Sequence, residues 1–287
     1  MSVKFETRIG PGFWTHPTFE GMHFPAGEAH VKVINENDHK GELTEVATLK
    51  GADGNDLMLL AAWADAVWAR GGRSVLIAPY LPGARQDKDL DSTAYRDFFD
   101  GLTLEQIIVF DPHSQAAVNY YWNPKLTVLH SAPIVRKIVG RVDSDEKAPN
   151  YHGLICPDEG AIERTKRIAS AVHLPIYYAR KKRNPDTGKL SGFECDPLPD
   201  TGKFLVVDDI CDGGGTFRGL AEVTGLPKER LGLYVSHGVF SGLAPNLFDD
   251  FGHIYTTNSY PAQWNLNPPA NLFTEFDIDP LLKEAIQ

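Results

Sequence analysis

Residues 204–216 read FLVVDDICDGGGT, and the order of residue types in this stretch is the strongest indication of the fold. An apolar run typical of a buried strand is followed by Asp208 and Asp209, then by three glycines and Thr216. This order predicts a strand of a parallel sheet that turns into a helix. Glycines let backbone N–H groups approach an anion closely, and the amino end of the helix adds partial positive charge. The stretch therefore predicts a sugar-phosphate cradle, with the two acids suited to ribose hydroxyls or to a metal that holds them. A dinucleotide-binding turn fits less well because the GxGxxG spacing is missing.

Short apolar runs alternate with helical patterns along the rest of the chain, as in βαβ units. Strands are expected at residues 29–35, 74–78, 106–110, 152–156, 175–179, 203–207 and 231–236. Helices are expected at residues 55–70, 132–140, 161–173 and 216–223. The polar stretch 141–151 is the best linker candidate, so we expect two α/β domains, residues 1–141 and residues 142–287. Because ligands bind beyond the carboxyl ends of parallel strands, the residues that follow each strand are the candidates for a site.

The composition excludes several classes of protein. The chain has 287 residues, which suits two domains, and its net charge of -10 argues against a nucleic-acid partner. Cys156, Cys195 and Cys211 show neither a disulfide framework nor a zinc pattern, which fits a reducing compartment. The first residues lack an apolar signal core, and no apolar run is long enough to span a membrane. We therefore expect a cytoplasmic protein that does not bind membranes.

Further segments carry residue types that suit phosphate chemistry. Residues 79–88 read PYLPGARQDK, residues 111–115 read DPHSQ, and residues 156–160 read CPDEG, each after an expected strand. Residues 180–183 read RKKR, before a loop-like stretch at 184–188. Taken singly, each has an ordinary explanation: an ion pair on a surface loop, a structural histidine, a helix N-cap or a solvated basic cluster.

Taken in order, these segments resemble a known family. With residues 24–28 (FPAGE) and 237–242 (HGVFSG), they are similar to the motifs of the ribose-phosphate pyrophosphokinases over roughly residues 22–260. The stretch at 204–216 also resembles the signature of type I phosphoribosyltransferases, which have one such domain and need no ARQD or D-x-H-S segment. The resemblance implies an α/β fold of two type I phosphoribosyltransferase-like domains, each a parallel sheet flanked by helices.

The resemblance also assigns roles to residues. ATP would be bound by Phe24, Glu28, Arg85, Gln86, Asp87 and His113. Lys181, Arg183 and His113 would be catalytic, with the two basic residues in a flexible loop and a shift to Lys182 left open. The sugar phosphate would be held by Asp208, Asp209, Asp212, Gly213, Gly214, Gly215 and Thr216. Metal would be reached by His113 and Asp158.

The implied reaction is a Mg²⁺-dependent transfer of the β,γ-diphosphate of ATP to the C1 hydroxyl of ribose 5-phosphate. The cofactor would be Mg²⁺, and the partners ATP and a ribose phosphate. Phe24 and Glu28 would complete a neighbour's site, so a homodimer or a higher homo-oligomer is expected. Two rival readings stay open: a non-catalytic subunit of the family, and a phosphoribosyltransferase that never uses ATP.

The phosphate turn departs from the family pattern D-T-x-G-T. Gly213 stands where the family offers a hydroxyl to the 5-phosphate, so the turn is more open and less suited to a monoester. Either backbone N–H groups compensate, or the phosphate is a diester within a longer substituent, as in ADP-ribose. Phe217 or Arg218 would then meet the extension. Ala26 stands where an acid often helps to read adenine, and residues 36–41 lack an arginine that the family uses for regulation, so nucleotide choice and regulation are open.

Overall fold

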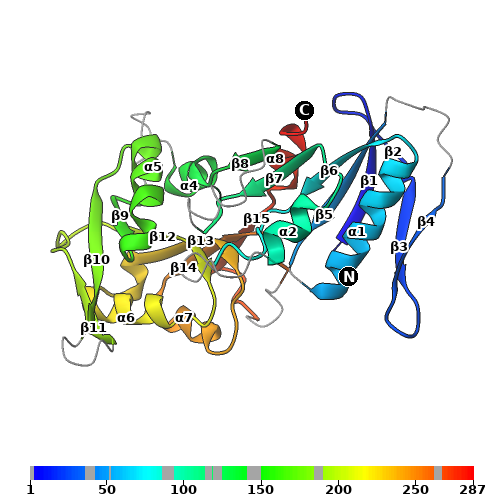
Figure 1. Cartoon of the computed structure of the whole chain (residues 1–287). Helices are drawn as coiled ribbons and strands as arrows, with labels where there is room; N and C mark the ends of the chain where they lie inside the picture. The colour runs from blue at the N-terminus through cyan, green and yellow to red at the C-terminus, as the bar shows by residue number, and fades with distance from the viewer. Residues whose placement is uncertain are drawn as a thin grey trace. The chain divides into compact units, whose positions relative to one another are not determined.

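The computed structural model describes residues 3–35, 43–51, 53–85, 94–113, 118, 125–140, 150–183, 190–261 and 267–287, with the backbone only at 181–183 and 190–191. The chain forms two compact units (Figure 1). The first unit comprises Met1–Leu129 and Ile278–Gln287, and the second comprises His130–Asp277. The domain boundary expected between residues 141 and 142 stays a prediction, because residues 141–149 lie outside the described residues.

The first unit is built on a six-stranded sheet of order β2-β1-β5-β6-β7-β8. Its strands are β1 (Val3–Ile9), β2 (Trp14–Thr15), β5 (Leu43–Leu49), β6 (Arg73–Ile77), β7 (Gln106–Phe110) and β8 (Leu126–Leu129). β5 to β8 are parallel, whereas β1 is antiparallel to β5 and to β2. The other elements are the hairpin of β3 (Phe19–His23) and β4 (Ala29–Val33), and helices α1 (Gly54–Ala69), α2 (Ala94–Asp100) and α8 (Asp279–Glu284).

The core of the first unit lies between α1 and the sheet. The helix begins at the N-cap Asp53, whose side chain accepts a hydrogen bond from the backbone N–H of Asn55. Its buried face includes Leu59 and Trp63, and the Trp63 ring stacks on Phe5 of β1 with centroids 5.5 Å apart. The strand expected at 29–35 is β4, which pairs with β3 in a hairpin separate from the six-stranded sheet.

The second unit is built on a seven-stranded sheet of order β11-β10-β9-β12-β13-β14-β15. Its strands are β9 (Gly153–Cys156), β10 (Ile176–Arg183), β11 (Leu190–Cys195), β12 (Phe204–Cys211), β13 (Leu231–Gly238), β14 (His253–Thr257) and β15 (Phe273–Phe276). Only β11 among these runs antiparallel to its neighbour. The α-helices are α4 (Ala132–Val139), α5 (Ile162–Val172), α6 (Gly215–Thr224) and α7 (Leu247–Asp250).

Two expected strands extend four residues beyond their expected carboxyl ends. β12 continues past residue 207, so that Asp208 and Asp209 lie within the strand and not beyond it. β10 continues past residue 179 as far as Arg183, and Lys181 pairs with Phe193 of β11. The basic cluster at 180–183 was expected in a loop, and this was wrong for its backbone. The antiparallel partner β11 supplies the hydrogen bonds that extend the strand.

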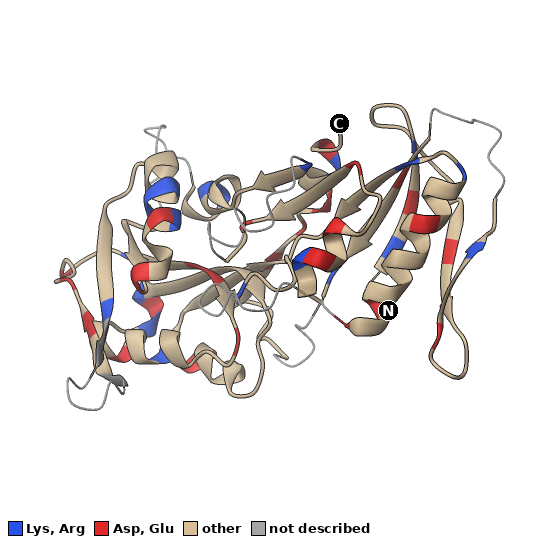
Figure 2. Ribbon diagram, in the orientation of Figure 1, with Lys and Arg blue, Asp and Glu red and all other residues tan. Residues whose placement is uncertain are grey.

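Charged residues of both signs are distributed along each unit. Figure 2 shows Lys and Arg interspersed with Asp and Glu, for instance on α5. Within the described ranges, none of the helices has the length and apolar character that crossing a bilayer requires.

Candidate functional site

The paired acids of β12 are held by a buried arginine. The guanidinium of Arg164, on α5, lies 3.2 Å from Asp208 Oδ1 and 3.1 Å from Asp209 Oδ1. The Arg164 side chain is 8% exposed, and those of Asp208 and Asp209 are 14% and 3% exposed. The backbone N–H of Asp209 also donates to Asp208 Oδ1 at 2.9 Å. Two carboxylates are thus fixed side by side with one cation between them.

This arrangement destabilises the ionised form of the Asp208 carboxyl group. Burial, and then the neighbouring charge of Asp209, raise the pKa of Asp208 well above the ordinary value for an aspartate, although Arg164 partly opposes the rise. A carboxyl group of this kind gains from a ligand that brings positive charge or hydroxyl donors. Ribose hydroxyls and a metal ion both meet that description.

The strand that carries these acids extends beyond one of its neighbours. β9 pairs with β12 only as far as Val206, whereas β13 pairs with it to Cys211. The end of β12 therefore has a strand partner on one side only. Asp208 lies on this part of the strand, where the carboxyl edge of a parallel sheet receives ligands.

The glycine turn after β12 has the geometry that its sequence predicts. Gly214 adopts a left-handed conformation with φ of 78° and caps α6, whose backbone begins at Gly215. A Cβ at Gly214 would lie 3.1 Å from the Leu247 side chain, so the position is both strained for other residues and closely packed. A Cβ at Gly213 or Gly215 would meet no described atom within 4 Å. The turn is thus open on the side where an anion would approach.

Four hydrogen bonds tie this turn to the segment that follows β13. The backbone N–H groups of Val239 and Phe240 donate to the carbonyl of Cys211 at 2.9 and 3.0 Å. The backbone N–H of Ser241 donates to the carbonyl of Asp212 at 3.1 Å, and the Ser241 hydroxyl donates to Asp212 Oδ1. Asp212 is therefore fixed by the HGVFSG segment before any ligand binds.

The end of β9 leads to a second predicted position, Asp158. Its Oδ1 accepts a hydrogen bond from the backbone N–H of Gly160 at 3.1 Å, so Asp158 is the N-cap of the short 3₁₀ helix Glu159–Ala161. The CPDEG motif therefore does contain a helix N-cap, which is its ordinary structural explanation. A metal role for Asp158 stays a prediction, because a capping carboxylate has further lone pairs.

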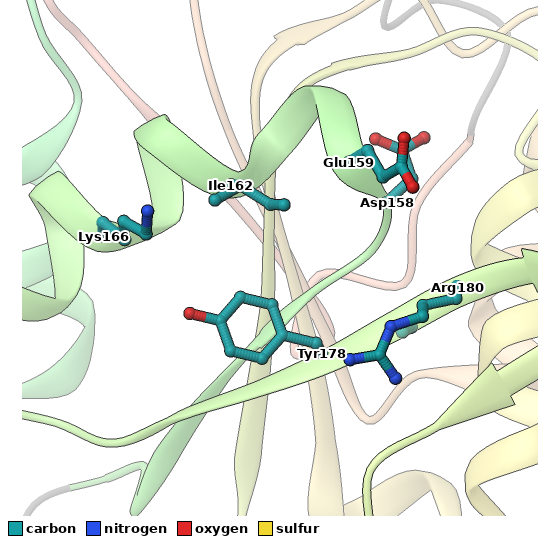
Figure 3. A pocket seen from close by; sticks show the side chains of 7 residues that line it. Asp158, Glu159, Ile162, Lys166, Tyr178 and Arg180 are labelled. Atoms are coloured by element: carbon teal, nitrogen blue, oxygen red, sulfur yellow. The ribbon is translucent and has the colours of Figure 1, made fainter.

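A hollow of about 300 Å³ lies beside Asp158, between α5 and β10. Figure 3 shows the carboxylates of Asp158 and Glu159 near one end and Lys166 at the other, with the Tyr178 ring and Arg180 on the β10 side. Both signs of charge line it. Lys166 pairs with Glu163 at 2.9 Å, and Arg180 lies 3.4 Å from Asp196.

The predicted ATP residues belong to the first unit. Phe24 is 44% exposed and ends the β3 side of the hairpin, where its backbone N–H donates to the carbonyl of Glu28 at 2.9 Å. Arg85 is exposed and is the last residue of a turn at residues 82–85. His113 follows β7, after Asp111, which is buried with φ of 42°. Their roles stay predictions.

Several predicted residues are outside what the structure describes. Gln86 and Asp87 lie in the undescribed stretch 86–93, and only the backbone of Lys181 and Arg183 is described. Thr216 lies in the first turn of α6 and is partly exposed. Phe217 is 3% exposed in the core, so the idea that it meets a substrate extension was wrong.

The sequence analysis missed two residues of this site. Arg164 falls on the buried stripe of α5, four residues before Ile168 and eight before Val172. An arginine on an apolar stripe needs a carboxylate partner, and this periodicity could have revealed it. Ser241 lies in the motif at 237–242, but no local pattern predicts its contact with Asp212, which joins residues 29 positions apart.

The comparisons with known proteins agree with this geometry. No family model matches the chain. It is 25% identical over 284 residues to a ribose-phosphate pyrophosphokinase from Pasteurella multocida, covering 92% of this chain and 85% of that protein. It is 29% identical over 259 residues to one from Pyrococcus abyssi, covering 84% and 83%.

The chain is thus similar over most of its length to curated ribose-phosphate pyrophosphokinases. A solved phosphoribosylpyrophosphate synthetase from Mycobacterium smegmatis has the same fold, with a TM-score of 0.70 at 20% identity over 92% of this chain and 87% of that one. The fold class expected from the sequence is thereby confirmed. The family's motif stretch at 204–216 coincides with the acid pair and turn described above.

Proposed function

We propose that the protein transfers the β,γ-diphosphate of ATP to the C1 hydroxyl of ribose 5-phosphate, giving phosphoribosyl pyrophosphate and AMP. The main support for the proposal is the pair of acids Asp208 and Asp209, which both contact the Arg164 guanidinium. This pair precedes the open glycine turn at the start of α6. The relatives named above are ribose-phosphate pyrophosphokinases, which supports diphosphate transfer onto a ribose phosphate.

In the proposed reaction the sugar is held at two points. The turn at Gly213 to Thr216 supplies backbone N–H groups and the end of a ten-residue helix for the 5-phosphate. Asp208 accepts hydrogen bonds from the ribose hydroxyls, while Arg164 fixes its orientation. A new bond then forms between the C1 oxygen and the β-phosphorus, the bond from that phosphorus to the α-phosphate oxygen breaks, AMP leaves with the electron pair, and the hydroxyl proton passes to solvent.

The residues present suit a Mg²⁺ ion that is bound jointly by protein carboxylates and by substrate oxygens. In the described part of the chain, no three His, Cys, Asp or Glu side chains gather to hold a metal ion. Mg²⁺ usually binds one or two carboxylates together with substrate oxygens, so Asp158 and Asp208 are suitable contributors. When bound, the ion would neutralise charge on the phosphate groups.

The test is incubation of the protein with ATP and Mg²⁺, with and without ribose 5-phosphate, followed by quantification of AMP and of the sugar diphosphate. We expect stoichiometric AMP and diphosphate only when sugar is present. Asp208→Asn should abolish the product, whereas Lys137→Ala, at an exposed position on α4, should not change it. Absence of AMP with any acceptor would favour the non-catalytic subunit.

A second acceptor is favoured by the open space at Gly213. Nothing described would obstruct a side chain there, so packing does not require the loss of the hydroxyl found in the family. A turn without that hydroxyl suits a phosphodiester, as in ADP-ribose, whose C1 hydroxyl is equivalent. Arg218, in the first turn of α6, is 42% exposed although it contacts Asp250 at 3.1 Å, so it remains a candidate to meet the extension.

The variant Gly213→Thr separates the two acceptors. A hydroxyl at this position would add a hydrogen bond to a charged phosphate, worth about 1.5–3 kcal/mol. If ADP-ribose is the better acceptor of the unmodified protein, the variant should shift preference toward ribose 5-phosphate by roughly tenfold or more. Equal use of both acceptors before and after the change would remove this alternative.

A further inference from the structure

A second and larger hollow lies at the opposite edge of the sheet in the second unit. Its volume is about 650 Å³, within the range of small-molecule sites. The residues around it precede or open the parallel strands: His152 before β9, Lys203 before β12, Leu231 at the start of β13 and His253 at the start of β14. The Asp208 pair and the glycine turn lie at the carboxyl ends of these strands. The two hollows are therefore separate sites.

The rim of this hollow carries a local excess of positive charge. Lys203 and Lys228 line it, against one acid, Glu229. The Lys228 ammonium donates one hydrogen bond, to the carbonyl of Phe248 at 3.1 Å, and keeps two further donors. The Lys203 side chain has no ion-pair partner in the ranges that the structure describes. Two lysines that line one hollow in a chain of net charge -10 indicate a place where an anion can bind.

The wall beside the lysines is aromatic. His253 stacks on Tyr255, with ring centroids 4.3 Å apart and an angle of 28° between the planes. Tyr151 donates from its hydroxyl to that of Tyr255 at 3.3 Å. Burial lowers the pKa of His253, so that its ring is neutral at physiological pH, and Nε2 is 2.8 Å from Thr274 Oγ1. The wall is thus flat, uncharged and fixed by hydrogen bonds.

We propose that this hollow binds a small aromatic anion of the nucleotide type, with its ring against the His253–Tyr255 stack and its phosphate between Lys203 and Lys228. Stacking needs a flat partner with an exposed face, and the partly buried His253 ring supplies it. The Tyr255 ring supports His253 from behind, since it lies between His253 and Phe276 with ring centroids 4.3 and 6.5 Å away. Glu229 is exposed at the rim and accepts hydrogen bonds only, so it suits the amino group of a base. The site uses none of the residues assigned to ATP or to the sugar.

The test is isothermal titration of AMP into four proteins: the unmodified chain, Lys203→Glu with Lys228→Glu, Tyr255→Leu, and the control Lys137→Glu. Lys137 is an exposed lysine of α4 in the same unit, so the control repeats the charge change away from the hollow. We expect one class of AMP sites to weaken by about tenfold or more in the double variant and in Tyr255→Leu. The control should bind as the unmodified chain does.

Inorganic phosphate is the second probe, because it lacks a ring. We expect it to bind at least about tenfold more weakly than AMP, and Tyr255→Leu to leave that weak binding unchanged. If the double variant does not fold, Lys203→Ala is used, since this exposed side chain makes no described ion pair.

Three results would overturn the proposal. These are AMP binding that is equal in all four proteins, phosphate that binds as tightly as AMP, and an unmodified chain that binds AMP at no site. Hydrogen exchange gives an independent location: AMP should slow exchange at residues 150–154 and 252–255 in the unmodified chain and not in the double variant. Because binding is measured without turnover, failure here is distinguishable from failure of the proposed reaction.

Discussion

At the scale of single residues, the site depends on the buried positive charge of Arg164. Arg164 is 8% exposed and contacts two carboxylates, a combination that proteins keep only where the charges compensate one another. Because one cation faces two acids, the cluster retains negative character. A metal ion or a ligand with hydroxyl donors can compensate this excess negative charge. The cluster is therefore suited to binding a ligand, and contributes less to stability.

The first prediction concerns the stability cost of Asp208. Its raised pKa means that the folded protein binds a proton there more tightly than the unfolded chain does. Stability is therefore lost as the pH rises from about 4, the ordinary value for Asp, through the folded-state pKa. Asp208→Asn removes this cost, and its amide oxygen can still accept from the Asp209 N–H. We expect its melting temperature to rise by about 2–4 °C near pH 8 and not below about pH 4.

Calorimetry of the variant across this pH range checks the prediction. The matched control is Asp200→Asn, which removes an exposed acid of the same unit and should change the melting temperature little. A variant less stable than the unmodified protein near pH 8 would mean that the Arg164 contact outweighs the burial of Asp208.

The second prediction concerns Ser241, which positions Asp212. Ser241→Ala removes the hydroxyl that donates to Asp212 Oδ1 and leaves the two backbone bonds of Cys211 in place. A hydrogen bond to a charged group contributes about 1.5–3 kcal/mol, so kcat/KM for the sugar should fall roughly 10- to 100-fold. The control is Thr224→Ala, which removes a 2.8 Å bond to the carbonyl of Ala221 at the far end of α6. Equal losses in both variants would argue against a positioning role.

At the scale of elements, α6 lies unusually close to the strand pair beside it. A Cβ added at Gly219 would lie 2.2 Å from the Phe193 ring of β11, so only glycine permits this approach. The same helix presents its amino end to the glycine turn, so its packing sets the position of the phosphate site. This contact is a tertiary constraint on a residue that helix propensity alone disfavours.

The third prediction tests that constraint. Gly219→Ala should gain helix propensity and yet lose about 1–3 kcal/mol of unfolding free energy, because the ring or the helix must move. Gly54→Ala at the start of α1 is the control, since a Cβ there would meet no described atom within 4 Å. Denaturant unfolding of both variants measures the difference. A Gly219→Ala protein as stable as the control would show that the contact adjusts without cost.

At the scale of the whole molecule, the last residues of the chain belong to the first unit. Ile278, Leu282 and Ile286 are buried, and the carbonyls of Ala285 and Ile286 accept hydrogen bonds from Gln106 and Arg8 at 2.9 and 3.0 Å. The first unit is therefore formed from two segments of the chain, and the second unit lies between them in the sequence.

The fourth prediction is that removal of residues 278–287 destabilises the first unit selectively. Each buried apolar side chain contributes about 1.5–3 kcal/mol, so the loss should be several kcal/mol. Hydrogen exchange should accelerate in β1 and β7 while β12 and β13 keep their protection. The control is Lys283→Ala, which breaks its surface contacts with Glu6 at 2.8 Å and with the Trp14 ring at 4.4 Å and should cost about 1 kcal/mol. Uniform acceleration in both units would contradict the prediction.

Local sequence was enough to predict many of the strands and helices in each unit, and the phosphate turn. Buried strands such as β7 and β9 are continuous apolar runs, helices such as α1 begin at a capping residue, and Gly214 is needed for its positive φ, all of which depend on neighbouring residues. The family motifs were visible for the same reason, since each one lies within a single strand end or loop.

The extent of the strands and the contacts between distant side chains depend on how the elements pack. β10 continues through a basic cluster because β11 pairs with it, and no propensity of that cluster predicts the pairing. The Arg164–Asp208 and Ser241–Asp212 contacts join residues 44 and 29 positions apart, where their geometry depends on the assembled sheet. The hollow at the amino edge is likewise formed where the starts of β9, β12, β13, β14 and β15 come together in the assembled sheet. Local energies determine elements, whereas contacts between distant residues form only once those elements have packed.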